Sequence, residues 1–445
     1  MADDASLASF AEGFDTALSG LPGRALTDAR QRGMAAFQAH GVPGRSVEAW
    51  KFTDLRRFLS RHAFGPAPTG LVDGDVAGRV AALGSVDDAA RLVFLNGRLV
   101  ADLSALPRLP HGVTVSGLAN ALAKPDATNL VGLLGTVVGE TEDTLIGLNA
   151  AWMEDGFLLD VPAGIAVPGP IRIIHVIQPG KDAFAVHPRH VIRLGANASA
   201  TIIEDHIGDD GAASFVNGVT EVTLAEGAAL RHYRNAEGAT QGLEVQRVHA
   251  HVARDARFES FVLAIGGQLT RHESVVTLAG SAAEAHVGGA YLGRDRQHRD
   301  NTILVQHDAP NCLSRQVFKG VLDDRARGVF QGKIKVDRLA QKTDGHQLNK
   351  SLLLSRGAEI DAKPELEIYA DDVKCSHGAT AGEIDGDALF YLRSRGVPET
   401  AARRLLVQAF LAEALVEISD DGVRDRFGAM VDTWMTEEFS RKDAA

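Results

Sequence analysis

The sequence predicts a mainly β protein whose core is a parallel β-helix flanked by helical segments on both sides. From about residue 156 to residue 385, short strand-like runs follow one another without a long helix. Within that region a two-residue turn recurs with a period near 30 residues, which is typical of a solenoid. Before and after it, apolar residues follow the spacing of amphipathic helices.

Residues 1–150 are expected to form a helical N-terminal region with a mixed linker. Two short amphipathic helices are predicted within residues 5–40, where apolar residues recur at helical spacing: Phe10, Phe14, Leu18, Leu26, Met34 and Phe37. Residues 65–90 are rich in Gly, Ala, Pro and Asp, which indicates a loop or a weak helix.

Residues 151–384 are expected to form the β-helix core. The runs 157–161 and 171–177 are typical strands, because apolar and β-branched residues dominate them and Pro or Gly bounds them. A solenoid leaves unpaired strand edges at both ends, and the flanking helices could cap them. An uncovered last coil could instead add to another molecule's sheet.

The repeated turn is a polar or small residue followed by alanine. It occurs at Asn197-Ala198, Gly227-Ala228, Asp255-Ala256, Ser281-Ala282, Arg325-Ala326 and Gly357-Ala358. The alanines are 30, 28, 26, 44 and 32 residues apart, so the long interval predicts an insertion around residues 294–310. A β-sandwich with strands every 8–12 residues or so is the competing interpretation, and the repeat favours the β-helix.

Residues 385–445 are expected to form a C-terminal helical domain. Pro398 suits the first position of a helix, and an apolar stripe continues from there to about Ile418. The stripe includes Leu405, Leu406 and Phe410 and is wide for a surface helix, which indicates contact on more than one side. Packing within a helical hairpin explains most of the stripe, and a bound partner protein would explain the excess.

Composition excludes several classes of function. The 445 residues carry a net charge of −12 and no long basic run, which argues against nucleic-acid and anionic-membrane surfaces. Two cysteines cannot form a disulfide framework, and the acidic start at residues 1–4 is unlike a signal peptide. The most apolar stretch, 405–418, is interrupted by charged and amide side chains, so no membrane span is expected. We expect a cytoplasmic protein.

Cys375 and His377 form the candidate metal-ligand pair. Thiolate and imidazole suit zinc or iron. If residues 374–377 are extended, the two side chains point to the same face. The pair alone is weak evidence, because a free cysteine usually packs as a small apolar side chain and a metal site needs more ligands.

Other polar clusters are less specific. Histidines and carboxylates gather in the β region at His187 and His190, at His249 and His251, at His298, Asp300 and His307, and at Glu204-Asp205-His206. None is followed by a further ligand at a recognised spacing. The doublets Asp323-Asp324 and Asp371-Asp372 could be the acids of a carbohydrate-active β-helix enzyme. Adjacent strand residues point to opposite faces, however, so turn acids are the favoured interpretation.

The chain contains none of the common nucleotide-binding or hydrolase motifs. A phosphate-binding Gly-x-x-x-x-Gly-Lys loop, a dinucleotide-binding glycine motif and Gly-x-Ser-x-Gly are all missing from the sequence. We therefore do not expect the chain to hydrolyse ATP itself. Cys312 has no nearby histidine tied to it by the sequence, and we interpret it as a packing residue.

Several segments resemble the SufB/SufD family, the scaffold proteins of the SUF iron–sulfur cluster assembly system. The resemblance spans nearly the whole chain and is most specific in Lys-Cys-Ser-His-Gly-Ala-Thr at 374–380 and Phe-Tyr-Leu-Arg-Ser-Arg-Gly at 390–396. Further matching segments are 50–54, 330–336, 341–344, 347–355 and 363–368. Leu392, where the SufB branch commonly has cysteine, and the low cysteine count favour the SufD branch. The pair Gly345-His346 departs from the family pattern.

The resemblance implies a right-handed parallel β-helix between N-terminal and C-terminal helical domains. It also implies a complex in which a SufB-like paralogue meets the end of the β-helix and a SufC-like ABC ATPase binds the C-terminal helices. By this resemblance Cys375 and His377 are functional residues near the shared interface, and we expect Arg395, Gly396, Leu405, Leu406 and Phe410 to bind partners.

A ligand count agrees with this implication. A [4Fe–4S] cluster needs about four ligands, mostly thiolates, and two cysteines cannot supply them. Any nascent cluster would be transient and shared with a partner, and Cys375 could be a ligand or a structural residue. The leading hypothesis is a non-catalytic scaffold. The alternatives are a polysaccharide lyase or hydrolase and a purely structural adaptor. The sequence does not indicate whether a flavin binds.

Overall fold

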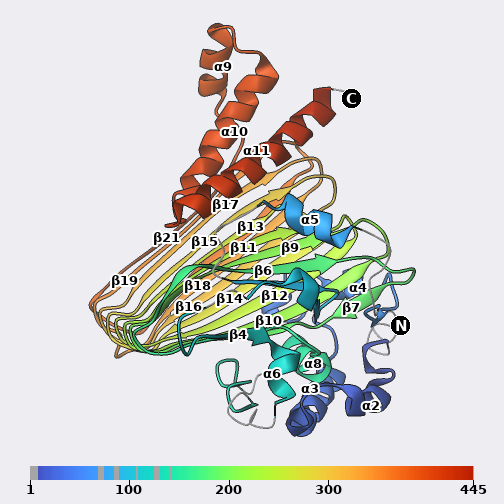
Figure 1. Ribbon diagram of the computed structural model, residues 1–445. Coiled ribbons are helices and arrows are strands. Elements are labelled where there is room, and N and C mark those ends of the chain that lie inside the picture. Colours follow the sequence, from blue (N-terminus) through green and yellow to red (C-terminus); the bar gives the residue numbers. More distant parts are fainter. Residues whose placement is uncertain are drawn as a thin grey trace.

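The computed structural model describes residues 9–68, 75–84, 90–106, 109–124, 131–139 and 143–443. Two long sheets lie face to face, and successive strands of the chain alternate between them, so that the chain winds as a parallel β-solenoid (Figure 1). Helical segments lie on both sides of this core. The predicted fold class, a β-helix flanked by helices, is confirmed.

The two sheets, here called sheet A and sheet B, contain 11 and 10 strands. Sheet A comprises β1 (Gly65–Pro66), β4 (Thr114–Gly117), β5 (Phe157–Val161), β7 (Phe184–Val186), β8 (Arg189–Leu194), β10 (Ser214–Leu224), β12 (Gly242–Val252), β14 (Leu269–Leu278), β16 (His298–His307), β18 (Arg327–Val336) and β20 (Glu359–Ile368). Sheet B comprises β2 (Ala90–Leu95), β3 (Arg98–Leu99), β6 (Ala166–Ile177), β9 (Ser199–Gly208), β11 (Ala229–Glu237), β13 (Arg257–Ala264), β15 (Glu284–Gly293), β17 (Leu313–Leu322), β19 (Thr343–Leu353) and β21 (Val373–Gly382).

The lumen between the sheets is filled by columns of stacked apolar side chains. One column of sheet A consists of Val222, Ala250, Val276, Val305 and Ile334, which pair in register from β10 to β18. All five are buried. Burial of a Val or Ile side chain stabilises a fold by about 1.5–3 kcal/mol. Each added coil therefore raises the free energy of unfolding through its own column residues.

The repeated turns that lead into sheet B, from Asn197 to Ser281, stack above one another along one edge of the solenoid. Residues at the turns have left-handed backbone, with φ of 56° at Asn197, 66° at Gly227 and 55° at Asp255. The Asn197 N–H donates to Glu226 O at 2.8 Å, and the Gly227 N–H donates to Arg254 O at 2.9 Å. These bonds link each turn to the next coil, which explains why Asn, Gly and Asp recur there.

The predicted insertion around residues 294–310 is wrong. This segment contains the regular strand β16 and parts of its two flanking turns. Ser281-Ala282 precedes the sheet B strand β15, whereas Arg325-Ala326 precedes the sheet A strand β18. The 44-residue interval therefore spans about one and a half coils. Asn311-Cys312 is the next turn in the stack that leads into sheet B.

The N-terminal region mixes short helices with strands β1 to β4. Its helices are α2 (Phe14–Ala17), η1 (Leu18–Gly20), η2 (Arg24–Leu26), α3 (Thr27–His40), η3 (Glu48–Trp50), α4 (Leu55–Leu59), α5 (Val76–Ala82), η4 (Ala101–Leu103), α6 (Leu118–Leu122) and α8 (Thr144–Trp152). Helix α3 packs closely on α8: a Cβ at Gly33 would lie 2.4 Å from Gly147 O, so only glycine permits this contact. Parts of the predicted helix over 5–40 and of the segment 65–90 lie outside the described residues.

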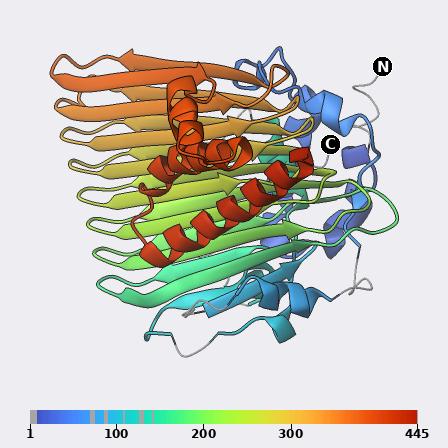
Figure 2. The ribbon, with the colours of Figure 1, turned by 90° about the horizontal axis from the view of Figure 1, so that it is seen from above.

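The C-terminal segment forms α9 (Gly386–Ser394), α10 (Glu399–Leu415) and α11 (Asp421–Asp443). Figure 2 shows α11 crossing the strands on the outer face of sheet B. Val407, Leu411 and Phe427 are buried there in one cluster with Tyr233 and Phe261 of the sheet. None of the described helices combines the length and the apolar character that crossing a bilayer would require.

Candidate metal-ligand edge of the last coil

The solenoid ends in two strands that each lack a neighbour on one side. Strand β21 pairs only with β19, and β20 pairs only with β18, within the part of the chain that the structure describes. Both strands lie at one end of the stack, farthest from the blue and green N-terminal strands (Figure 2). Their backbone N–H and C=O groups on that side can accept a further strand or coil.

Cys375 and His377 lie on the same face of β21, as the period-two spacing predicts. Cys375 is in register with Gly345 and His377 with Gln347. Gln347 points into the lumen, because its Nε2 donates to Gln316 Oε1 at 2.9 Å in the buried interior. Both candidate ligands therefore lie on the lumen side of the last strand, where no further coil covers them.

The environments of the two candidate ligands differ. Cys375 is partly buried beside an apolar cluster that includes Ile334, Val336 and Ala370. Burial and the nearby charge of Asp344 raise the pKa of the Cys375 thiol, although a backbone hydrogen bond from Gly345 acts in the opposite direction. The thiol is therefore protonated at neutral pH, and binding a metal would require it to lose that proton.

His377 is exposed, and its ring makes no hydrogen bond to any described residue. The nearest comparable histidine, His346 on β19, differs because it contacts Ser376 Oγ at 2.7 Å and Asp344 Oδ1 at 2.7 Å. An exposed imidazole without a partner is available to bind a metal ion that arrives from outside the chain.

The second cysteine lies elsewhere. Cys312 is in the turn before β17, buried, with its Sγ 3.2 Å from Gly280 O. Strand β19 lies between β17 and β21, so the two cysteines are separated by two strand spacings, about 10 Å. The interpretation of Cys312 as a packing residue is confirmed, and the two thiols do not meet in one site.

Exposed apolar side chains lie close to the ligand pair. Leu339, in the turn before β19, is 74% exposed, and Tyr369, just after β20, is 58% exposed. Ile368 adds to this group, which we call the last-coil patch (Leu339, Ile368 and Tyr369). Large exposed apolar residues beside open strand edges are typical of a surface that binds another protein.

The C-terminal residues singled out by the sequence have mixed environments. Arg395, Gly396 and Leu405 are exposed, whereas Leu406 and Phe410 are partly buried. The Phe410 ring lies against sheet B, with Lys319 Nζ 4.4 Å from its centroid. On the same hairpin Phe390, Tyr391 and Val416 are also exposed, which the helical spacing of the sequence does not predict.

Most of the other histidines have internal roles. His298 Nε2 lies 2.8 Å from the Thr53 hydroxyl, and His307 Nε2 lies 2.8 Å from Ser314 Oγ. His249 and His251 share the outer face of β12, and no third donor joins them among the described residues. These histidines do not form a metal site.

The acidic doublets lie in turns, as expected. Asp371 and Asp372 are exposed in the turn before β21. Asp323 is buried and accepts a hydrogen bond from Ser355, while Asp324 pairs with Arg441. Neither doublet forms a pair of facing carboxylates.

One group of donors was missed by the sequence analysis. His175, Glu204 and His206 meet inside the lumen near the first coils. By itself the run Glu204-Asp205-His206 is unspecific, and His175 lies about 30 residues away in the sequence. Two signals were available: Glu204 and His206 alternate on one strand, and His175 precedes His206 by about one coil.

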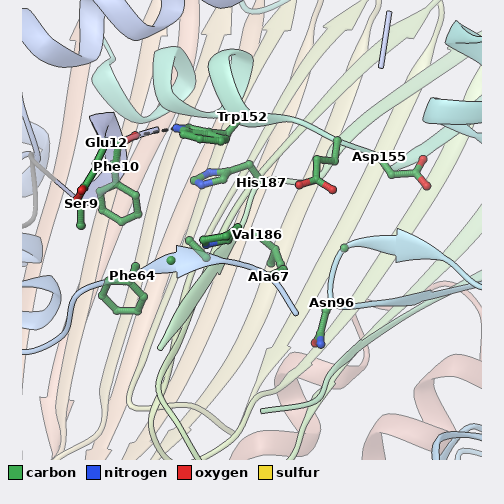
Figure 3. A pocket seen from close by; sticks show the side chains of 15 residues that line it. Ser9, Phe10, Glu12, Phe64, Ala67, Asn96, Trp152, Asp155, Val186 and His187 are labelled. Carbon is green, nitrogen blue, oxygen red and sulfur yellow. Dashed lines mark hydrogen bonds between the residues drawn. The ribbon is translucent and has the colours of Figure 1, made fainter. Parts of the chain in front are cut away.

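A cleft lies between the N-terminal segment and the edge of sheet A (Figure 3). Phe10, Phe64, Trp152 and His187 line it, and the Trp152 indole N–H donates to Phe10 O at 2.8 Å. Burial lowers the pKa of His187 to about 3, so the ring is neutral. The cleft offers about 70 Å³ to water-sized molecules, which is small beside the roughly 300–1,000 Å³ of typical ligand pockets.

Comparison with known proteins connects this architecture with a family. The model of the "SUF system FeS cluster assembly, SufBD core domain" matches residues 176–410, and that of the "SufBD protein N-terminal region" matches residues 15–173. The SufBD family iron–sulfur cluster assembly protein of Synechocystis is 31% identical over 413 residues, which cover 90% of this chain and 89% of that protein.

Two SufD proteins also match over most of their length. Escherichia coli SufD is 31% identical over 394 residues, covering 88% of this chain and 89% of that protein. Bacillus subtilis SufD is 26% identical over 391 residues, covering 87% and 88%. The β-solenoid, the motif on its last strand and these matches together show that the chain belongs to the SufBD family of SUF-system iron–sulfur cluster assembly proteins and is a homologue of SufD.

Proposed function

We propose that this chain is a non-catalytic scaffold subunit that completes an iron–sulfur cluster site together with a SufB-like partner. The observation that carries the proposal is the position of Cys375 and His377 on the lumen face of an unpaired last strand. With one of its two cysteines distant from this edge, the chain offers at most one thiolate and one imidazole there.

The ligand count supports a shared site. A cluster with about four ligands would need two or more from another molecule. Neutral His377 is the better first ligand, because it is exposed and Cys375 must first lose a proton held by its raised pKa. Cys375 would then bind only after the approaching metal lowers the pKa of its thiol.

The SufB-like partner would meet the chain end to end. The open edges of β20 and β21 can continue the sheets of a second solenoid, and the last-coil patch would be buried in that contact. The exposed apolar residues of the C-terminal hairpin, among them Tyr391 and Leu405, would bind a SufC-like ABC ATPase. ATP-driven movement of the SufC-like partner would strain the contact between the two solenoids. The ligands buried in that contact would then become exposed.

The test is the substitution His377→Ala in cells that depend on the SUF system. We expect the variant to copurify with its partners at normal levels, whereas cluster maturation falls at least tenfold, because the substitution removes a ligand and no packing contact. His346→Ala is the matched control, since His346 is also an exposed histidine of the last coils but already has protein partners.

Two results would count against the ligand role. Normal maturation in His377→Ala, and in the double variant Cys375→Ser–His377→Ala, would favour the purely structural adaptor. Loss of the complex in His377→Ala would assign the residue to the interface rather than to the cluster.

A further inference from the structure

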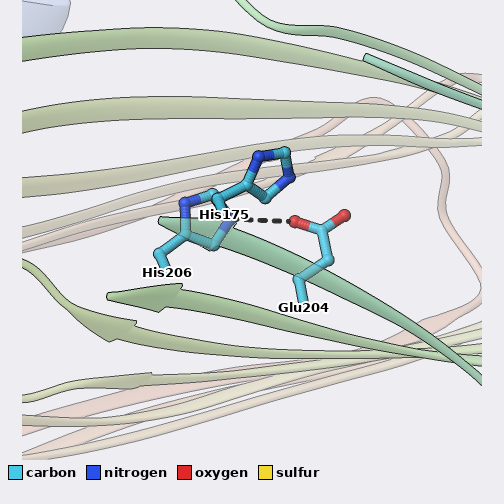
Figure 4. Close-up of side chains that lie close together, drawn as sticks. All are labelled: His175, Glu204 and His206. Atoms are coloured by element: carbon cyan, nitrogen blue, oxygen red, sulfur yellow. Dashed lines mark hydrogen bonds and ion pairs between the residues drawn. The ribbon is translucent and has the colours of Figure 1, made fainter. Parts of the chain in front are cut away.

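A second group of ligand atoms lies inside the solenoid, at the end opposite to β21. His175 on β6 and Glu204 and His206 on β9 converge in the lumen (Figure 4). All three side chains are buried, none more than 5% exposed as a residue. One ligand atom from each lies within 4.8 Å of the others.

Two of the three donors already have the separation of ligands on one ion. His206 Nε2 and Glu204 Oε2 are 3.2 Å apart, and two ligands bonded at about 2.1 Å to the same ion lie roughly 3–3.5 Å from each other. The third donor is unsatisfied, because His175 Nε2 is buried without a hydrogen-bond partner among the described residues. A buried polar atom without a partner is unfavourable, and a bound ion would supply the missing partner.

A second layer of contacts orients two of these donors. His206 Nδ1 lies 3.2 Å from Glu244 Oε1, and Glu204 Oε1 lies 2.9 Å from His232 Nε2. His206 Nε2 contacts Glu204 Oε2, and a tautomer protonated on Nδ1 would direct its Nε2 lone pair at an ion bound between the two side chains. Such carboxylate–histidine contacts are typical of metal sites, where they fix the tautomer and the direction of the ligand.

The charge state also suits a cation. Burial and the neighbouring His206 and His190 hold the pKa of His175 well below its ordinary value, so its ring is neutral. Contacts with His232 and His206 hold the pKa of Glu204 below its ordinary value despite burial, so the carboxylate is charged. Neutral imidazole and ionised carboxylate are the forms that bind metals.

We propose that His175, Glu204 and His206 form a binding site for one divalent first-row transition-metal ion inside the solenoid. Two imidazoles and one carboxylate are a donor set that suits ferrous iron and zinc and leaves positions open for water. A cavity lined by His175, His206 and Glu244 adjoins the site and offers about 30 Å³ to water-sized molecules, enough for at least one. The site is independent of the ligand pair on the last strand.

The buried guanidinium of Arg234 places a positive charge beside the proposed metal site. Arg234 lies on β11 in register with Glu204, and its guanidinium donates to His272 Nδ1 at 3.0 Å. This positive charge opposes the entry of a dication, so both Glu204 and Glu244 must contribute negative charge. Replacing either carboxylate by its amide should therefore weaken binding strongly.

The experiment titrates the full-length chain with Fe²⁺ without oxygen and, separately, with Zn²⁺. The chain carries Cys375→Ser and His377→Ala, so that the exposed pair contributes nothing. Calorimetry and metal analysis after desalting should give one ion per chain, and the tighter of the two ions identifies the preferred metal. Glu204→Gln and His206→Asn should each weaken binding at least tenfold, and Glu244→Gln by about 10–100-fold.

His249→Asn is the matched control, a partly buried histidine on the outer face of sheet A whose replacement should leave binding unchanged. Circular dichroism tests folding, and if His206→Asn does not fold, the isosteric Glu204→Gln decides. The proposal is overturned if the chain binds neither ion, if Glu204→Gln binds as tightly as its parent, or if only His249→Asn loses binding. Because the last-strand ligands are absent throughout, failure here leaves the proposed scaffold function untouched.

Discussion

The two ends of the solenoid are built differently. At the first coils, sheet A closes with the antiparallel strand β4 on β5 and sheet B with the antiparallel hairpin of β2 and β3, and four of the five residues of β5 are buried. At the last coil, β21 has no fully buried residue and lacks an outer neighbour among the described strands. The first coils are thus flanked by antiparallel strands of the same chain, whereas no described strand covers the outer edge of β21.

Polar residues differ between the ends in the same way. Near the first coils Glu204 contacts both His206 and His232 in the buried lumen. On the last strand Cys375 and His377 also point to the lumen side, but no further described coil covers them. The same strand geometry thus produces an internal cluster at one end and an exposed pair of candidate ligands at the other.

The largest expected effect is the loss of stability when a buried side chain of the lumen is removed. Phe258 is fully buried in the lumen, so Phe258→Ala should lower the free energy of unfolding by about 3–5 kcal/mol. Leu339→Ala, at a residue that is 74% exposed, should change it by less than about 0.5 kcal/mol. Denaturant unfolding measures both, and similar losses for the two variants would contradict the contrast between the filled lumen and the exposed last-coil patch.

The next effect concerns partner binding. Leu339→Asp combined with Tyr369→Asp places two charges in the last-coil patch, which should weaken copurification of a SufB-like partner at least tenfold, or about 1.4 kcal/mol. Folding should be retained because both side chains are exposed. Val47→Asp, at a residue that is 45% exposed in the N-terminal region, is the control and should not affect the complex. An unchanged double variant would exclude the patch from the interface.

A smaller effect is the pH dependence of the Cys375 thiol. Because its pKa is raised, the folded chain holds the thiol proton more tightly than the unfolded chain; this stabilisation is present below the unfolded pKa and is lost as pH rises through the folded value. In a Cys312→Ser background, alkylation should increase with pH about a midpoint above that of a free thiol. Asp344→Asn should move the midpoint down and Asp371→Asn should not, because burial and Asp344 raise the pKa of the thiol and Asp371 does not contribute.

The sequence predicted the fold because each coil repeats the same local requirement. Residues such as Asn197 and Asp255 mark turns that need a left-handed backbone, and they recur once per coil. The false insertion arose because a dipeptide does not reveal at which edge of the solenoid its turn lies. Ser281-Ala282 and Arg325-Ala326 look alike although they precede strands of different sheets.

The candidate site was predictable only in part. The alternation of Cys375 and His377 fixed their common face, but whether that face was covered depended on how many coils follow. The cluster of His175 with Glu204 and His206 required knowledge of the register between strands about 30 residues apart. The exposure of Phe390 and Tyr391 depends on how the C-terminal helices pack, which helical periodicity alone does not determine.

Hydrogen–deuterium exchange of the full chain, with and without a SufB-like partner, tests the central claim most directly. The account predicts that the backbone amides of β21 exchange rapidly in the free chain and become protected when the partner binds, while those of β5 and β9 remain slow in both states. Unchanged exchange in β21, with protection appearing at the first coils instead, would contradict it.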